Sequence, residues 1–256
     1  MNNTKQEYHD YLSQMLDDLA DEKTAVWFTN YLKGEIKYRG LKTGMLKNVL
    51  SKFFDETGAN TLSISEQLAH IRNWLAKPMA EDKLIALLWL QEGLKFNLKY
   101  SKDSSFIDQV LDLLEDTFQK GHIHDWSTND WLCVRVLEIV PEKYPQCIPR
   151  LMKWSSSNSI WQRRSSILSF KKGGKNGKYF ENIEHLIKNL LPSDERFIQT
   201  AIGWVLSDIS RKFPEKSLQL FEKHFMDLSH EVIVRHAKYL TNYESLKNKS
   251  RKRKNR

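Results

Sequence analysis

The sequence predicts an all-α fold in which consecutive antiparallel helices are joined by short turns. Apolar residues recur at helical spacing along almost the whole chain. Turn signals such as Lys33-Gly34, Lys77-Pro78 and Gly173-Gly174 interrupt this pattern roughly every 15 to 20 residues. No segment shows a convincing strand alternation, and the presence of only ten Gly and six Pro among 256 residues favours long regular elements.

The turn signals divide the chain into about a dozen helices. In chain order, the clearest predicted helices are residues 65–76, 82–96, 106–119, 160–170, 195–212 and 216–225. Helices of this length, with short turns and no second composition regime, are typical of a HEAT-like α-solenoid built from antiparallel helix pairs. A compact irregular bundle is the alternative, because no clean internal sequence period is present.

The helical pattern predicts one helical-repeat domain, residues 1–245. The charge distribution predicts a basic disordered tail after it, residues 246–256. The net charge is +8, but seven of the 40 Lys and Arg residues lie within the last ten positions, which leaves 33 basic against 32 acidic groups. A short basic tail attracts polyanions through counterion release without selecting a site. A merely solvated end has the same composition, so specific nucleic-acid binding must come from clusters in the body.

Several classes of protein are excluded by missing features. The sequence has no apolar run of about 18 residues and a polar amino terminus, so no membrane span or signal peptide is expected. Cys133 and Cys147 are typical of buried thiols in a reducing compartment. His122 and His124 lack further ligands at metal-binding spacing, and no dinucleotide-binding or serine-hydrolase motif occurs. We therefore expect neither a metal nor a cofactor.

Two positions break the apolar pattern of their predicted helices. Trp204 lies roughly 140° from the centre of the apolar stripe on a helical wheel of 100° per residue. It is therefore either packed against a neighbouring helix or exposed to a ligand. Arg164 lies at the centre of the apolar face of WQRRSSILSF, while Arg163 leans outward. A guanidinium in that place needs a carboxylate, a phosphate or several carbonyls, so a structural ion pair and a functional role both stay open.

The segment HDWSTNDWLCVRVL holds a carboxylate in apolar surroundings. Trp126 and Asp130 are four residues apart and would share one face of a continuous helix, together with Cys133. A carboxylate in such surroundings is costly unless it is paired or used in function. Alternatively, Ser127 and Asp130 have the spacing of a capping box, which makes Asp130 a first-turn acid at a helix start.

The segment KKGGKNGK interleaves lysines with glycines. Lys171, Lys172 and Lys175 suit a mobile loop that touches phosphates, although a solvated turn has the same composition. The spacing required for a P-loop is absent.

Four segments can be compared with known families as a set. They are YLKGEIKYRGLKTGMLKNVL (31–50), HDWSTNDW (124–131), WSSSNSIWQRR (154–164) and ERFIQTAIGWVLSDISRKFPE (195–215). Taken in this order they resemble the DNA alkylation repair proteins of the AlkD type, over a region from about residue 30 to 240. The chain departs from the family pattern at Gly44-Met45, where an acid usually follows a small residue or proline.

The resemblance implies a HEAT-like α-solenoid whose concave face binds duplex DNA. It also implies a monofunctional hydrolase, a DNA glycosylase that excises cationic N3- and N7-alkylated purines without a metal or cofactor. Asp130 matches the catalytic aspartate of the family. Trp126 and Trp204 match the tryptophans beside the deoxyribose of the lesion, and Arg164 matches the arginine at the backbone of the lesion.

Further expectations concern partners and place. We expect additional DNA contacts from Arg163, Lys171, Lys172, Lys175 and Lys42. The expected partner is double-stranded DNA that contains alkylated purines, with no membrane or metal involved. We expect a monomer in the cytoplasm, associated with the nucleoid. The alternatives are a non-catalytic HEAT-like protein that binds damaged or branched DNA, and a protein-interaction scaffold.

Overall fold

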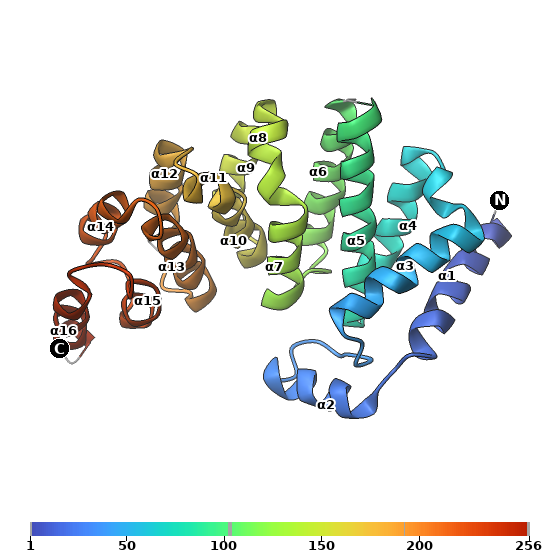
Figure 1. Ribbon diagram of the computed structural model, residues 1–256, viewed down its shortest axis with the longest axis horizontal. Coiled ribbons are helices and arrows are strands. Elements are labelled where there is room, and N and C mark those ends of the chain that lie inside the picture. The colour runs from blue at the N-terminus through green and yellow to red at the C-terminus, as the bar shows by residue number, and fades with distance from the viewer. Residues whose placement is uncertain (1, 102–103, 192, 255–256) are drawn as a thin grey trace. The chain divides into compact units, whose positions relative to one another are not determined.

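The computed structural model describes residues 2–101, 104–191 and 193–254 (Figure 1). The regular secondary structure of these residues is helical, and the one β interaction among them is an isolated bridge between Lys37 and Met79. The predicted all-α fold is confirmed. The six clearest predicted helices correspond to α4 (Ile64–Ala76), α5 (Ala80–Phe96), α6 (Ser104–Gln119), α10 (Ile160–Leu168), α13 (Arg196–Ser210) and α14 (Pro214–Lys223). Their observed ends lie within two residues of the predicted ones.

The chain forms two compact units, Met1–Val136 and Leu137–Arg256. The sequence predicts a single helical domain over residues 1–245, whereas the backbone contacts divide this region after Val136. The division falls directly behind α7 (Trp126–Arg135), where the α-helix gives way to the short 3-10 helix η3 (Leu137–Ile139). No change in composition marks this point, so hydrophobic patterning alone does not locate it.

In the first unit, helices that are close in the chain pack around α5. The remaining elements of this unit are α1 (Asn2–Asp17), α2 (Glu22–Tyr31), α3 (Thr43–Thr57), η1 (Ala59–Thr61) and η2 (Asn97–Ser101). Helix α5 contacts α3, α4 and α7, and α4 also contacts α6. Every residue from Ala80 to Leu90 is buried, as expected for a helix that is surrounded by other helices.

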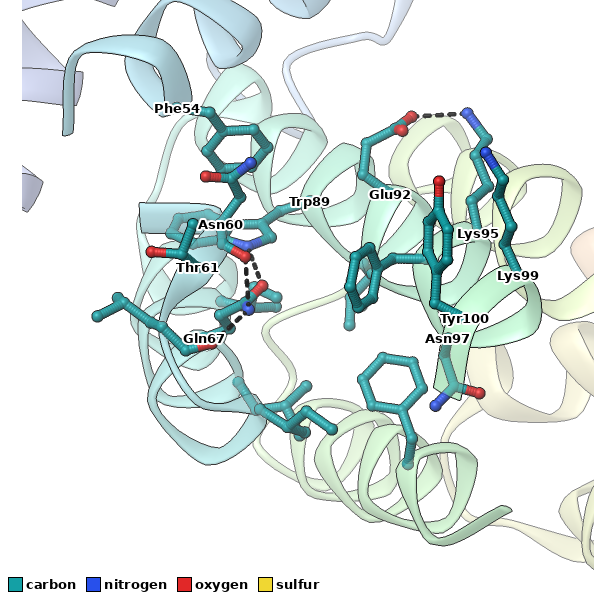
Figure 2. A pocket seen from close by; sticks show the side chains of 18 residues that line it. Phe54, Asn60, Thr61, Gln67, Trp89, Glu92, Lys95, Asn97, Lys99 and Tyr100 are labelled. Atoms are coloured by element: carbon teal, nitrogen blue, oxygen red, sulfur yellow. Dashed lines mark hydrogen bonds and ion pairs between the residues drawn. The ribbon is translucent and has the colours of Figure 1, made fainter. Parts of the chain in front are cut away.

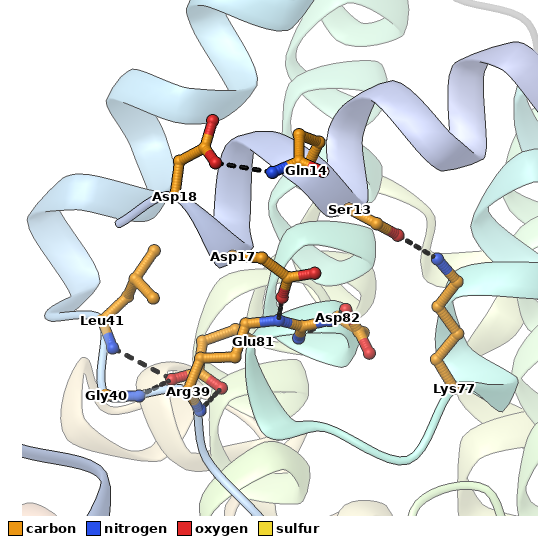
Figure 3. A network of polar contacts seen from close by, with 10 residues as sticks. All are labelled: Ser13, Gln14, Asp17, Asp18, Arg39, Gly40, Leu41, Lys77, Glu81 and Asp82. Carbon is orange, nitrogen blue, oxygen red and sulfur yellow. Dashed lines mark hydrogen bonds and ion pairs between the residues drawn. The ribbon is translucent and has the colours of Figure 1, made fainter. Parts of the chain in front are cut away.

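A buried carboxylate fixes the loop between α2 and α3 (Figure 3). The Glu81 side chain accepts hydrogen bonds from the backbone N–H groups of Arg39, Gly40 and Leu41 at 2.9, 2.9 and 3.0 Å. Gly40 has a φ of +95°, and a Cβ at this position would lie 2.7 Å from the backbone nitrogen of Ala25. A residue with a side chain does not fit here, so glycine is required for the loop to pass this close to α2.

The same loop is tied to α1 and α5 by Arg39. Its guanidinium lies 2.5 Å from a carboxylate oxygen of Asp17 and 2.8 Å from one of Asp82 (Figure 3). Asp82 is almost fully buried, and a buried charge is tolerated when it is paired in this way. The network fixes the part of the loop that carries Ile36 and Tyr38, two residues beside the start of α7.

In the second unit, α13 is the central helix. The unit also contains α8 (Val140–Lys143), η4 (Pro145–Cys147), α9 (Ile148–Lys153), η5 (Trp154–Ser156), α11 (Lys171–Lys175), α12 (Phe180–Leu190), α15 (His230–His236) and α16 (Tyr243–Lys254). Helices α10, α11, α14 and α15 all contact α13. The apolar stripe predicted for this helix, from Ile198 to Ile209, is fully buried.

The basic carboxyl-terminal segment is helical up to Lys254. Leu246 and Ser250 of α16 are buried, and the Arg253 guanidinium donates hydrogen bonds to the backbone carbonyls of Phe225 and Leu228. Positions 246, 250 and 253 lie on one face of a helix, which explains why this lysine-rich segment packs on the unit. This differs from the expected disordered tail, of which residues 255 and 256 lie outside the described part of the chain.

Candidate functional site

A buried cap fixes the start of α7. The Asp125 carboxylate accepts hydrogen bonds from the backbone N–H groups of Ser127 and Thr128 at 2.8 and 3.0 Å. The hydroxyl groups of both residues donate to the same carboxylate. Asp125 is 1% exposed, and it lies close enough to the buried Lys83 of α5 to interact with its charge. Burial nevertheless lowers the pKa of Lys83, to about 8.

Asp125 is therefore the N-cap of α7, and the capping-box interpretation of Ser127 and Asp130 is wrong. Asp130 lies in the second turn of a helix that is continuous from Trp126 to Arg135. Because they are four residues apart on this helix, Trp126 and Asp130 share one face. Both side chains are half-buried. The carboxylate thus stands one helical turn from an indole, without serving as a cap.

Trp126 packs against residues of the segment between α2 and α3. It packs against a small apolar cluster formed by Leu32, Ile36 and Ala80. Tyr38 packs on the same cluster, and its hydroxyl oxygen lies 3.0 Å from the Ser127 hydroxyl oxygen. Burial raises the pKa of Tyr38 to about 12, so this hydroxyl keeps its proton near neutral pH. The first turn of α7 is therefore fixed by a cap and by a tyrosine clamp.

In the second unit, α10 carries two arginines in different surroundings. Arg164 is 4% exposed, in agreement with its place on the apolar face, and it donates hydrogen bonds to the Phe197 carbonyl and the Thr200 hydroxyl of α13. Arg163 is more exposed. Its guanidinium lies 2.6 Å from a carboxylate oxygen of Glu195 and 2.8 Å from the Ser157 carbonyl oxygen.

Lys171 is buried beside Trp204. Its ammonium lies 4.7 Å from the Trp204 ring centroid, 2.7 Å from a Glu138 carboxylate oxygen and 3.2 Å from one of Asp208. Burial alone would lower the pKa of Lys171, but the two carboxylates outweigh this effect and raise it. Trp204 itself is half-buried. A lysine that is 8% exposed and paired twice does not fit the expected contact with a DNA phosphate.

The segment KKGGKNGK forms a short helix, α11, followed by a turn. Close packing accounts for the glycines in this helix. A Cβ at Gly174 would lie 2.7 Å from the terminal methyl of Ile183, so a larger residue at this position would require the Ile183 side chain to shift. Lys172 is exposed and Lys175 is half-buried. Lys42, the residue before α3 in the first unit, is also exposed. These lysines, unlike Lys171, can reach a polyanion.

Close packing fixes the part of α13 that precedes Trp204. A Cβ at Gly203 would lie 2.5 Å from the His236 ring and 2.9 Å from the Val232 side chain of α15. Burial, together with a smaller contribution from the charge of Arg235, lowers the pKa of His236 to about 4. His236 is therefore a neutral side chain packed against the backbone of α13 near neutral pH.

The sequence patterns do not assign the supporting roles of Asp125 and Tyr38 in the first unit or of Glu138 in the second. Tyr38 and Glu138 act through contacts with distant parts of the chain, Ser127 and Lys171 respectively. Asp125 is followed by Ser127 and Thr128, a cluster of helix-capping residue types in which the first acid is the cap. That order is the one sequence signal that could have identified the cap.

The first unit also contains a cavity of about 720 Å³ that involves no residue of α7 (Figure 2). Phe54, Trp89 and Phe106 contribute to its walls. The indole N–H of Trp89 donates to the Gln67 side chain at 2.9 Å. Among the described residues, no group of three or more His, Cys, Asp or Glu could hold a metal ion. No helix in the same part of the chain is long and apolar enough to cross a membrane.

Comparison with known proteins gives a family and a similar fold for this chain. The family model of the DNA alkylation repair enzymes matches residues 12–240. The fold is similar to that of a protein from Enterococcus faecalis, described as a predicted DNA alkylation repair enzyme, with a TM-score of 0.67 and 17% sequence identity. This similarity covers 87% of the present chain and 97% of the other one. No curated protein matches the sequence.

The helical fold and the matched region define an all-α protein of DNA repair. The chain belongs to the DNA alkylation repair enzyme family, since the family model covers most of its length. This membership confirms the resemblance found in the sequence. It assigns the protein to the repair of alkylated DNA and identifies DNA as its partner.

Proposed function

We propose that the protein is a DNA glycosylase that removes cationic N3- and N7-alkylated purines from duplex DNA. The observation that carries this proposal is the shared face of Trp126 and Asp130 on α7, behind a helix start fixed by Asp125 and Tyr38. A catalytic carboxylate must keep its position while charge develops on the substrate, and a rigid helix start provides that preorganisation.

The proposed reaction is hydrolysis of the N-glycosidic bond. An alkyl group at N3 or N7 makes the purine positively charged, so the base leaves with the bonding electron pair as a neutral molecule and needs no general acid. The sugar becomes an oxocarbenium ion, which water attacks at C1′ while its proton passes to the solvent. Asp130 stabilises the sugar cation and orients this water, an effect typically worth a few kcal/mol.

The two indoles have a related role. The face of an indole attracts a cation by about 0.5 to 2 kcal/mol, which supports Trp126 and Trp204 as residues beside the deoxyribose of the lesion. Arg164 ties α10 to α13, the helix that carries Trp204, through the Phe197 carbonyl and Thr200. We therefore assign Arg164 a positioning role in place of the backbone contact implied by the family, because its side chain is as buried as that of Lys171. Lys42, Arg163, Lys172 and Lys175 contact phosphates elsewhere on the duplex.

The test is an excision assay on randomly methylated duplex DNA with the full-length protein. A glycosylase releases free 7-methylguanine and 3-methyladenine, leaves abasic sites, and needs no added metal. The protein acts as a monomer on cytoplasmic DNA in this proposal. If the protein binds the methylated duplex but releases no base over the whole time course, the glycosylase proposal fails and a non-catalytic binding role replaces it.

A further inference from the structure

The cavity of the first unit has the size of a small-molecule site. Its volume of about 720 Å³ lies within the range of about 300 to 1,000 Å³ that is typical of such sites. Residues from α3, η1, α4, α5, η2 and α6 line it (Figure 2). None of its described lining residues belongs to α7 or to the second unit, so the cavity is separate from the residues proposed for base excision.

The inner wall of this cavity is apolar. Leu68, Ile71, Trp89, Leu90 and Phe106 all line it, and each of them is at most 8% exposed. A space with such walls suits water poorly, because each buried water molecule needs polar partners. A hydrocarbon group that enters the cavity therefore gains the burial of its own apolar surface.

The polar groups within the wall already have partners. The indole N–H of Trp89 donates to the Gln67 side-chain oxygen at 2.9 Å. The side-chain nitrogen of Gln67 donates in turn to the carbonyl oxygens of Asn60 and Leu62, at 3.1 and 2.8 Å (Figure 2). A molecule with polar groups along its body would have to break these bonds. The wall thus favours a body that has no hydrogen-bonding groups.

The charged residues of the cavity lie on one side of it. Among the described residues that line it, only Glu92, Lys95 and Lys99 carry a charge, and all three are exposed. The Lys95 ammonium lies 2.6 Å from a Glu92 carboxylate oxygen. The Lys99 ammonium lies 4.6 Å from the Tyr100 ring centroid, and within the described part of the chain it pairs with no carboxylate. One positive charge is therefore left over, which fits a molecule with a single negative group at one end.

Exposed aromatic rings extend the apolar wall to the surface. Phe96 and Tyr100 are 63% and 62% exposed, and their ring centroids lie 4.9 Å apart. Tyr100 belongs to η2, which continues α5 as a π-helix and also carries Lys99. A π-helical turn is rare and often occurs at a functional site. The apolar path into the cavity and its unpaired cation thus lie side by side on α5 and η2.

We propose that this cavity binds a free single-chain fatty acid, with the hydrocarbon chain along Trp89 and Phe106 and the carboxylate beside Lys99. Such a molecule combines a body without hydrogen-bonding groups and one negative charge at its end. A nucleotide fits poorly, because its base and sugar are polar and would lie against a wall whose polar groups are already bonded. This site goes beyond the proposed glycosylase function and does not depend on it.

The test is calorimetric titration of the full-length protein with octanoate and decanoate, each below its micellar concentration. We expect one molecule to bind per chain. Each added methylene should tighten binding about fourfold, so decanoate should bind about 16 times more tightly than octanoate. Decan-1-ol, which has the same chain but no charge, should bind about threefold more weakly than decanoate, because the attraction of Lys99 is lost.

Two surface variants test the place of the carboxylate. Lys99→Met should weaken the binding of decanoate about threefold and leave that of decan-1-ol unchanged. Glu92→Gln releases Lys95 from its ion pair, so decanoate should bind about twofold more tightly. Lys47→Met is the matched control, because Lys47 is an exposed lysine of α3 that does not line the cavity, and it should change neither affinity.

A third variant tests the place of the hydrocarbon chain. Leu62 is half-buried and lines the cavity. Leu62→Trp adds a large ring at this wall, so it should weaken the binding of decanoate and of decan-1-ol alike, by about tenfold. If this variant does not fold, Lys99→Met and the chain-length series still decide the question, because neither alters the core.

Three results would overturn the inference. One is an affinity that does not change between octanoate and decanoate. Another is a Lys99→Met variant that binds decanoate as tightly as the unmodified protein does. The third is binding to vesicles of phosphatidylglycerol without binding to monomeric decanoate, which would make this surface a membrane contact. None of these measurements uses DNA, so their outcome is separate from that of the excision assay.

Discussion

The ammonium of Lys171 lies over the indole of Trp204, 4.7 Å from the ring centroid, and is held there by Glu138 and Asp208. The lysine and both carboxylates are buried or nearly so, and the three groups form a compact charged cluster on one side of the tryptophan. Such a cluster restricts the motion of the ring. Lys171 therefore supports Trp204, and we expect any phosphate contact of this segment to come from its exposed neighbour Lys172.

The first prediction separates these two lysines. Lys171→Met removes the cation from Glu138 and leaves Asp208 only the more distant Arg211, at 3.9 Å, so we expect the free energy of unfolding to fall by about 3 kcal/mol. Lys172→Met should change it by less than about 0.5 kcal/mol. Conversely, only Lys172→Met should reduce the slope of log affinity for duplex DNA against log salt, by about 0.9. Urea unfolding and salt-dependent binding measure the two effects. An equal loss of slope in both variants would return Lys171 to the DNA interface.

A second prediction concerns the contact between α13 and α15. Gly203→Ala places a methyl group 2.5 Å from the His236 ring, and overpacking of this kind costs about 1 to 3 kcal/mol. Gly44→Ala is the control, because a Cβ at Gly44 in α3 meets no atom within 4 Å. The control should be neutral or stabilising by up to about 1 kcal/mol. Equal unfolding free energies for both variants would show that the close approach at Gly203 does not exist.

A third prediction follows from the pKa of His236. Burial lowers this pKa from 6.5 to about 4 in the folded protein, so between these pH values the unfolded chain binds a proton that the folded chain excludes. Stability rises with pH wherever the unfolded state holds more protons, so the contribution of His236 is present above pH 6.5 and is lost as the pH falls toward 4. In urea unfolding, the difference between the unmodified protein and His236→Asn should shrink over this window. A difference that is constant with pH would contradict the buried neutral imidazole.

A fourth prediction addresses helix α16. Lys249, Arg251 and Lys252 are exposed, whereas Arg253 is engaged with the carbonyls of Phe225 and Leu228. Replacing the three exposed residues with Gln should weaken binding to every duplex and reduce the salt slope by about 2 to 3. Single-turnover excision at saturating protein should persist, because these residues only attract the phosphate backbone. Loss of excision at saturation would place α16 in the reaction itself.

The sequence predicts the helices well because the spacing of apolar residues within each helix reflects which of its faces is buried. The apolar stripe of α13 and the buried position of Arg164 both follow from the spacing of residues within one helix. The capping-box interpretation of α7 is wrong because Ser127 and Asp125 are both good N-cap residues, and the hydrogen bonds identify Asp125 as the cap. The tail was expected to be disordered because its lysines dominate the composition. Leu246 and Ser250 provide the buried face that composition does not reveal.

The candidate site was harder to predict for a physical reason. Lys171 and Lys172 are equivalent in the sequence, yet one is buried against Glu138 and the other is exposed. The difference depends on residues more than 30 positions away, which no local pattern contains. Trp27 and Tyr31 have the spacing of an ordinary buried helical stripe, so the sequence does not predict that they are exposed. The structure shows their exposure, since α2 buries none of its residues.

The most direct test of the proposed function is the single-turnover release of 7-methylguanine from duplex DNA by Asp130→Asn, with protein in excess. We expect this variant to bind the duplex within about twofold of the unmodified protein and to release base at least about 100 times more slowly, since a preorganised charge is lost. Asp55→Asn, which removes an exposed carboxylate from α3, should keep the full rate. Release by Asp130→Asn at the rate of the unmodified protein would remove Asp130 from the chemistry and, with it, the proposed mechanism.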